Sequence, residues 1–197
     1  LYYYAMKYLS FFILLFIGEL SVSAQHMFSR QFPFFNQLSS NEIFSIHQDR
    51  EGYFWIGTTN GLARYDGYQL NTFRTDYKNQ NLLTDNGITA INDNDLYVWI
   101  GTWKGLNLYN KQTCRITPFP DARLLDKVVD AITVDKDGNV WVSAGGMIYR
   151  CDSTAHIIKE YEVGNIQEGY AISNIYVDQQ KQLWAVGSRG IFRYEPE

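Results

Sequence analysis

The residues best suited to contact a small ligand lie in short polar turns between apolar segments of the chain. Trp103 and Lys104 occupy one such turn, where an indole could stack on a sugar ring and an ammonium group could donate hydrogen bonds to its hydroxyls. Asn60 and Arg189 occupy nearby positions in two related turns and could share one rim with them. Because proteins often place ligand contacts on loops of a rigid scaffold, these four residues are the predicted ligand-binding set. The alternative for Trp103 is packing against a neighbouring loop or against a domain that lies outside this sequence.

The sequence contains no recognisable catalytic or metal-binding motif. His-Glu-x-x-His and Gly-x-Ser-x-Gly do not occur, and residues 187–190, Gly-Ser-Arg-Gly, lack the spacing of a nucleophile elbow. Residues 135–139, Asp-Lys-Asp-Gly-Asn, resemble a calcium loop, but the glycine is fourth rather than sixth and no glutamate closes the loop. His47 is expected to be a packed strand residue rather than a ligand. We therefore expect no enzyme activity, no metal and no cofactor in this chain.

Composition and charge narrow the class of protein. Of the 197 residues, 46% are apolar and 16% aromatic, which is enough for a large core and argues against disorder. The net charge is −4 and no basic run occurs, so nucleic-acid binding is not expected. The two cysteines, Cys114 and Cys151, have no partners at metal-ligand spacing, and whether they pair stays open.

Four tryptophans recur at nearly constant spacing, which indicates a repeat architecture. They are 44, 42 and 43 residues apart, and each lies in a strand that a tight turn joins to a second strand. Each repeat reads as four short antiparallel strands. The predicted fold is therefore an all-β β-propeller of four-stranded blades. The repeat tryptophans are Trp55, Trp99, Trp141 and Trp184.

Other positions in the repeat carry structural predictions. The tryptophans should fill the space between adjacent blades. Gly57 and Gly101, two residues after a tryptophan, should give room for the backbone of the neighbouring blade. An aspartate lies six residues before each tryptophan and should cap the preceding turn. These aspartates are Asp49, Asp93, Asp135 and Asp178.

The repeats divide the chain into about three and three-quarter blades, which is an incomplete ring. The last repeat stops before a fourth strand, so we expect an N-terminal fragment or a truncated gene product. A segment that is expected to form an apolar strand, and that could complete the ring, precedes the first blade. The predicted boundaries are 25–40 for this segment and 41–82, 83–125, 126–168 and 169–197 for the four blades.

Residues 1–24 have the features of a secretory signal peptide. Met6, the expected true start, is followed by Lys7, an apolar run over 8–17 and a Val-x-Ala pattern ending at Ala24. Glu19 interrupts the apolar stretch, which is too short to span a bilayer comfortably. Cleavage after Ala24 and export to the periplasm are therefore expected.

Residues 38–67 resemble the two-component regulator propeller repeat. The resemblance rests on Leu-Ser-x-Asn, Ile-x-x-Ile-x-Gln-Asp, Gly-x-x-Trp-Ile-Gly-Thr and Gly-Leu-x-Arg-Tyr-Asp-Gly in that order. That repeat is found in periplasmic sensor regions of hybrid two-component histidine kinases of Bacteroidetes-type bacteria. The resemblance implies a sensor that detects oligosaccharides and controls polysaccharide-utilisation genes. It also implies a homodimer whose membrane anchor and kinase lie downstream.

Two alternatives remain open at this point. One is a secreted propeller enzyme acting on glycans, which predicts histidine, tyrosine and carboxylate groups around the central channel. The other is a propeller that serves only as a protein-interaction scaffold, which predicts no small-molecule binding.

Overall fold

The computed structural model describes residues 30–75, 82–162, 172–188 and 190–194. The predicted signal peptide, 1–24, and Arg189 lie outside the described residues. The chain divides into two units, residues 1–32 and 33–197, and the second holds every helix and strand described below. No helix in the described part is long and apolar enough to cross a membrane.

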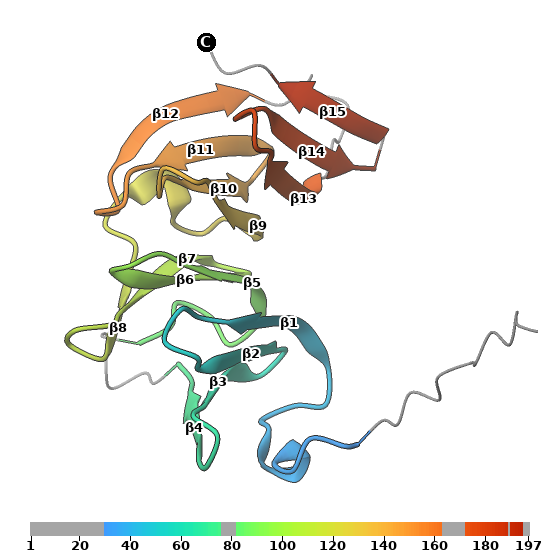
Figure 1. Ribbon diagram of the computed structural model, residues 1–197, viewed down its shortest axis with the longest axis vertical. Coiled ribbons are helices and arrows are strands. Elements are labelled where there is room, and N and C mark those ends of the chain that lie inside the picture. The colour runs from blue at the N-terminus through green and yellow to red at the C-terminus, as the bar shows by residue number, and fades with distance from the viewer. Residues whose placement is uncertain (1–29, 76–81, 163–171, 189, 195–197) are drawn as a thin grey trace, which may run out of the picture. The chain divides into compact units, whose positions relative to one another are not determined.

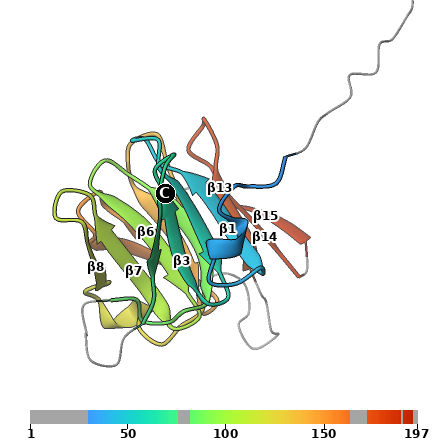
Figure 2. The ribbon, with the colours of Figure 1, turned by 90° about the horizontal axis from the view of Figure 1, so that it is seen from below.

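The described residues of the second unit form four antiparallel sheets in sequence order (Figure 1). Within each sheet the strands pair with their neighbours along the chain, and Figure 2 shows β6, β7 and β8 of one sheet side by side. The predicted β-propeller fold is confirmed, with three four-stranded sheets and one three-stranded sheet among the described residues.

The first sheet contains β1 (Ile43–Gln48), β2 (Phe54–Thr58), β3 (Gly61–Tyr65) and β4 (Leu70–Phe73). The second contains β5 (Ile88–Asp93), β6 (Tyr97–Thr102), β7 (Gly105–Asn110) and β8 (Arg115–Pro118). The third contains β9 (Val129–Val134), β10 (Val140–Ala144), β11 (Met147–Cys151) and β12 (Ile157–Glu162). The fourth contains β13 (Ile172–Val177), β14 (Leu183–Gly187) and β15 (Gly190–Tyr194).

Two short 3-10 helices lie outside the sheets. They are η1 (Phe35–Gln37) and η2 (Ala122–Leu124). The first falls in the segment 25–40 that was expected to supply a strand. In the described part of that segment, residues 30–40, there is no strand, so the expectation is wrong there.

An aspartate joins each hairpin turn to the repeat tryptophan in three of the four sheets. In the first sheet, Asp49 Oδ1 accepts hydrogen bonds from the amides of Glu51 and Tyr53, which closes the β1–β2 turn. The other oxygen, Oδ2, accepts from Trp55 Nε1 at 2.7 Å. The same pair recurs between Asp135 and Trp141 at 3.1 Å and between Asp178 and Trp184 at 2.8 Å. One carboxylate therefore fixes a turn and satisfies a buried indole N–H.

The second sheet breaks this pattern, and the prediction for Asp93 is wrong. Its β5–β6 turn is one residue shorter, so Asn94 takes the capping position and accepts from the amides of Leu96 and Tyr97. The side-chain oxygens of Asp93 point elsewhere. As a result, Trp99 Nε1 is buried without a hydrogen-bond partner among the described residues.

The repeat tryptophans pack in the space between one sheet and the next, as the repeat predicts. Trp55 lies in a core with Ile88 of the second sheet, and Trp99 lies in a core with Val129 of the third. Both indoles are fully buried. Trp184, on the fourth sheet, is only partly buried because no described sheet covers that face.

Gly57 and Gly101, two residues after Trp55 and Trp99, allow the next sheet to pack closely. The group that fills the space beside each glycine is a side chain, whereas we expected the backbone of the next sheet. A Cβ at Gly57 would lie 2.7 Å from Cγ2 of Ile88. At Gly101 it would lie 2.6 Å from Cγ1 of Val129. Each glycine therefore admits a β-branched residue from the first strand of the following sheet.

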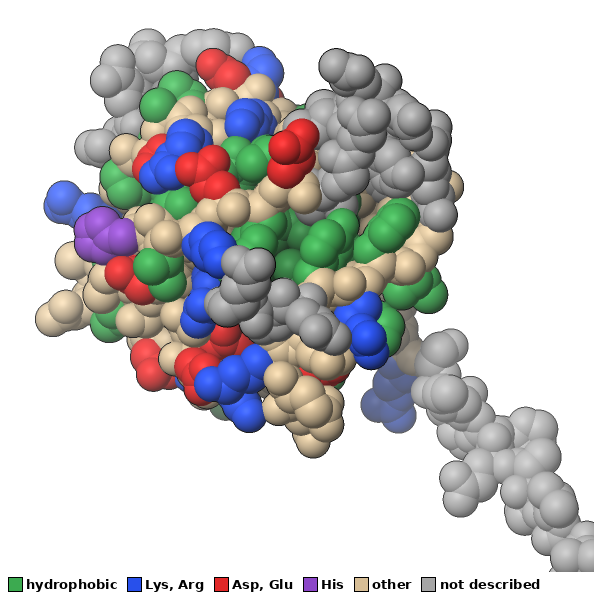
Figure 3. All heavy atoms as spheres, turned by 90° about the horizontal axis from the view of Figure 1, so that it is seen from above, with side chains coloured by type: hydrophobic (Ala, Val, Ile, Leu, Met, Phe, Trp, Pro, Cys, Tyr) green, Lys and Arg blue, Asp and Glu red, His purple; other side chains and the backbone are tan. Residues whose placement is uncertain are grey.

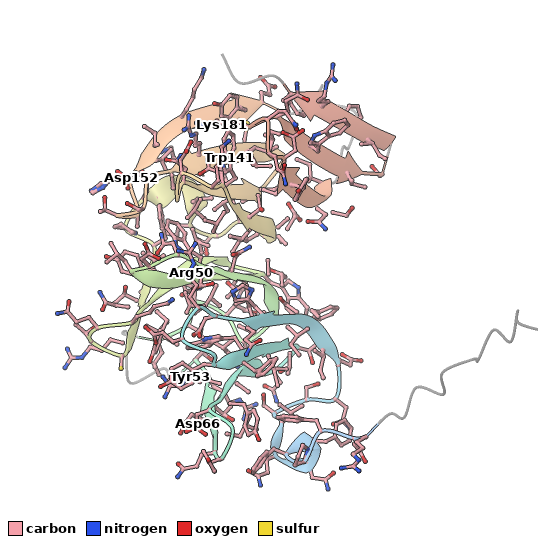
Figure 4. All side chains as sticks on the ribbon, viewed as in Figure 1. Arg50, Tyr53, Asp66, Trp141, Asp152 and Lys181 are labelled. Carbon is pink, nitrogen blue, oxygen red and sulfur yellow. The ribbon has the colours of Figure 1, made fainter. Side chains whose placement is uncertain are left out.

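Asp93 is instead the centre of an ionic contact between the first and second sheets. Its Oδ1 lies 2.7 Å from His47 Nε2, and its Oδ2 accepts from Lys111 Nζ at 2.7 Å and from the Arg50 amide at 3.3 Å. Arg50 lies where these two sheets meet, and its side chain also pairs with Asp95 (Figure 4). Burial raises the pKa of Asp93, but the hydrogen bonds from His47 and Lys111 outweigh that effect and bring it to about 2.

Asp93→Asn should destabilise the chain by about 2–4 kcal/mol at pH 7, because it leaves the buried Lys111 ammonium without its counter-charge. A lowered carboxyl pKa contributes stability above the unfolded-state value, and that stability is lost as the pH falls through the folded-state value. The difference between wild type and variant should therefore shrink as the pH falls from 3.8 towards 2. Urea unfolding across this range is the measurement. Asp137→Asn, which removes an exposed pair with Lys181, is the control and should cost less than about 1 kcal/mol.

Gly101→Ala should destabilise the chain by about 1–3 kcal/mol, because the added methyl group collides with Val129 in a packed interface. Val129→Ala provides space at the same point. The double variant should therefore be more stable than the sum of the two single effects implies. If the two single changes in the free energy of unfolding simply add in the double variant, the contact with Val129 is not the reason that residue 101 is glycine.

Candidate functional site

Trp103 lies in the β6–β7 turn and rests on Gly87. Its amide donates a hydrogen bond to the carbonyl oxygen of Gly87 at 3.1 Å. A Cβ at residue 87 would lie 2.3 Å from Cε3 of the indole, so only glycine admits the ring in this position. The side chain is nevertheless 45% exposed. The turn therefore holds an indole in a fixed place with part of its surface open to solvent.

Phe44 of β1 brings a second aromatic ring to the same place. The ring centroids of Phe44 and Trp103 are 6.2 Å apart with an edge-on angle of 66°. Phe44 is 57% exposed. Because β1 belongs to the first sheet and Trp103 to the second, the pair spans the contact between two sheets. We call Phe44, Gly87 and Trp103 the aromatic corner.

Phe44 lies in the first strand of its sheet, at a position where the first strand of each other sheet has a polar residue. The register of the sheets aligns it with Thr89, Asp130 and Ser173. In the second sheet, the Thr89 hydroxyl at this position donates to the carbonyl oxygen of Val129 in the next sheet at 2.5 Å. A phenyl ring cannot make that bond. It contacts Trp103 instead.

Lys104 places a cation beside the aromatic corner. Its side chain is 65% exposed, and Nζ lies 3.9 Å from Oδ2 of Asp85. Its backbone amide donates to Thr102 Oγ1 at 3.2 Å, which fixes the turn. Asp85 is 22% exposed, and its Oδ1 accepts from the Gly87 amide at 2.8 Å. A partly exposed pair at 3.9 Å is weak, so Lys104 Nζ and Asp85 Oδ2 are available to exchange their contact for hydrogen bonds to a ligand.

Asn60 has a structural role in its own loop. Its Nδ2 donates to the carbonyl oxygen of Ser39 at 3.2 Å, and its amide donates to Thr58 Oγ1. The structure thus brings Trp103 and Lys104 together, whereas Arg189 lies outside the described residues. Membership of Asn60 and Arg189 in a ligand-binding set stays a prediction.

Sequence reasoning missed Phe44 and Gly87. Phe44 could have been noticed by aligning the first strands of the repeats, because it is the one aromatic residue among polar ones at that position. Gly87 gives no such signal, since the need for glycine arises from the placement of Trp103 and not from the turn itself.

The aspartate-rich segment 135–139 forms a hairpin turn. Asp135 accepts hydrogen bonds from the amides of Asp137 and Asn139 and from Trp141 Nε1. Burial raises the pKa of Asp135, but the hydrogen bond from the Asn139 side chain, together with those from Trp141 and the two amides, holds it below its usual value. No group of three histidine, cysteine, aspartate or glutamate side chains suited to a metal ion occurs in the described ranges.

The two cysteines are both free thiols. Cys114 is exposed, with a φ of 55°, and Cys151 is buried in the third sheet. Burial raises the pKa of Cys151 to about 12, so its thiolate is scarce at neutral pH and the group is unreactive.

Comparisons with known proteins support the repeat and the fold. Residues 37–60 match the family model described as two component regulator propeller. Comparison with curated proteins gives no match. Among solved structures, the chain is similar to the extracellular domains of BT4673 and BT3049 of B. thetaiotaomicron, both named as hybrid two component systems. The identities are 22% and 23%, and the TM-scores are 0.63 and 0.61. In each case 81% of this chain is covered, and the chain spans 22% of the other.

Enzymes share the fold as well. Virginiamycin B lyase from Staphylococcus aureus is 18% identical, with a TM-score of 0.57, and the match covers 79% of this chain and 56% of the lyase. Structural similarity at these sequence identities establishes the fold only, and activity must be argued from the residues of the site. The chain is thus a β-propeller whose residues 37–60 carry a two component regulator propeller repeat.

Proposed function

We propose that this chain is the ligand-sensing propeller portion of a hybrid two-component sensor kinase, exported to the periplasm. The observation that carries the proposal is the regulator propeller repeat at residues 37–60 within a propeller array. The likeness to two extracellular domains of hybrid two component systems supports it. The kinase, the membrane anchor and a second protomer belong to the remainder of such a protein.

The proposed ligand is an oligosaccharide bound at the aromatic corner. Sugar rings present C–H groups on one face and hydroxyls at the edge, which suits an exposed indole next to polar groups. Trp103 offers the ring, and Lys104 and Asp85 offer a donor and an acceptor beside it. A ligand of this class would control polysaccharide-utilisation genes through the attached kinase.

The position of the corner between two sheets offers a physical route to signalling. Phe44 moves with the first sheet and Trp103 with the second, so a sugar that contacts both rings binds most tightly at one placement of the two sheets. Ligand binding shifts a population only when affinity differs between two states. The proposed signal is therefore a change in sheet packing that reaches the dimer and biases the kinase.

Trp103→Ala should weaken oligosaccharide binding by at least about tenfold, because losing a stacking surface costs about 1.4 kcal/mol or more. Calorimetry with a panel of oligosaccharides measures the affinity. Tyr68→Ala is the matched control, since Tyr68 is an aromatic residue that is 86% exposed in the β3–β4 turn. Unchanged affinity in the Trp103 variant would remove the corner as the site. Recovery of shortened sugar after incubation would favour a glycan-cleaving enzyme.

Gly87→Ala should weaken binding as much as Trp103→Ala does, because the new methyl group displaces the indole from its place. The same calorimetric titration tests this expectation. The double variant supplies the control: once Trp103 is alanine, the residue 87 substitution should have no further effect on affinity. A further loss in the double variant would mean that residue 87 acts on the ligand or the fold by another route.

A further inference from the structure

An arginine lies across from the repeat tryptophan in the three sheets where an aspartate accepts the indole N–H. Strand register pairs Trp55 with Arg64 in the first sheet, and the guanidinium carbon lies 5.8 Å from the centroid of the indole. The same distance is 5.4 Å in the third sheet and 5.8 Å in the fourth. Figure 3 shows Lys and Arg side chains next to hydrophobic ones on the side of the fourth sheet. The other two pairs are Trp141 with Arg150 and Trp184 with Arg193.

The second sheet lacks both partners of the indole. Trp99 Nε1 has no hydrogen-bond acceptor among the described residues, and Asp93 binds His47 of the first sheet instead. Register places Leu108 across from Trp99, where the other sheets have arginine. A tilted phenyl ring, that of Phe119, lies 5.8 Å from the indole. The carboxylate and the guanidinium are thus present together in three sheets and absent together in one.

Arg64 and Arg150 are partly buried without a carboxylate of their own. Neither has an ion-pair partner among the described residues, and Nε of each is buried without a hydrogen bond. The guanidinium of Arg64 also lies over Tyr53 at 4.8 Å and over Tyr109 of the second sheet at 5.7 Å. Removing a cation from water is costly unless its charge is compensated. Aromatic faces supply part of that compensation.

The aspartate makes the indole a better partner for the cation. An indole attracts cations through the negative face of its π-system. A carboxylate that accepts the indole N–H shifts electron density towards the ring, and groups linked in this way polarise one another in a low-dielectric interior. The neutral cap of the second sheet, Asn94, provides no such charge, which suits the apolar Leu108 across from Trp99.

We propose that the aspartate and the arginine of one sheet act as a charge pair through the tryptophan between them, and that this unit locks a hairpin turn to the neighbouring sheet. In the first sheet, Nη1 of Arg64 donates to the hydroxyl of Tyr109 in the second sheet at 2.5 Å. The contacts therefore run from Asp49 in the β1–β2 turn through Trp55 and Arg64 into β7. The arginine is a positioning residue in this unit.

A double-mutant cycle in the third sheet, around Trp141 (Figure 4), tests the unit. Arg150→Leu, which copies the residue of the second sheet, should lower the folding equilibrium constant of the 197-residue chain by about tenfold. Asp135→Asn removes the charge and leaves an oxygen that can cap the turn. In that background the same arginine change should cost about threefold or less. Urea unfolding gives both values. Arg115→Leu, at an exposed arginine of β8, is the control and should have the same effect in both backgrounds.

Two results would overturn the proposal. The first is an equal loss for Arg150→Leu with and without the charge of Asp135, because the arginine then acts on the ring alone. The second is a larger loss in the Asp135→Asn background, because the arginine then substitutes for the carboxylate instead of depending on it. The same cycle with Asp178→Asn and Arg193→Leu, in the less buried fourth sheet, gives the answer if the third-sheet variants do not fold.

Discussion

The packing of a repeat tryptophan against the following sheet is the constraint on which this structure depends. Packing an indole between two sheets is most favourable when its N–H finds an acceptor and the next strand can approach closely. The aspartate of the turn provides the acceptor in three sheets, and a small residue two positions on allows the approach. In the first and third sheets, an aspartate, a tryptophan and a small residue therefore set turn, strand and interface together.

The second sheet leaves the Trp99 N–H without an acceptor among the described residues, and its departures from the repeat gather at its contact with the first sheet. Asp93 leaves the tryptophan and binds His47, Lys111 and the amide of Arg50. The aromatic corner lies at the opposite end of β5. One interface thus holds an ionic contact at one end and an exposed aromatic pair at the other. The proposed sensing mechanism places ligand binding where the repeat is least regular.

The period of the tryptophans was enough to predict the propeller, because each repeat encodes one sheet and the sheets differ little. The role of Asp93 was predicted wrongly. Asp93 lies six residues before Trp99, as the other aspartates do before their tryptophans, but the turn is one residue shorter and Asn94 takes the capping position. The prediction that Gly101 makes room for neighbouring backbone was also wrong, because sequence spacing cannot show which atoms of the next sheet come closest. The aromatic corner depends on a contact between residues 44 and 103, and no local pattern encodes it.

The two cysteines make opening of the array directly observable. Cys114 is exposed on the second sheet, whereas Cys151 is buried in the core that also holds Trp99 and Val129. A thiol reagent added to the folded protein meets the Cys114 sulfur at once and reaches Cys151 only when the core around it opens. The rate of alkylation at Cys151 therefore measures how often that core opens, with Cys114 as the internal standard in the same molecule.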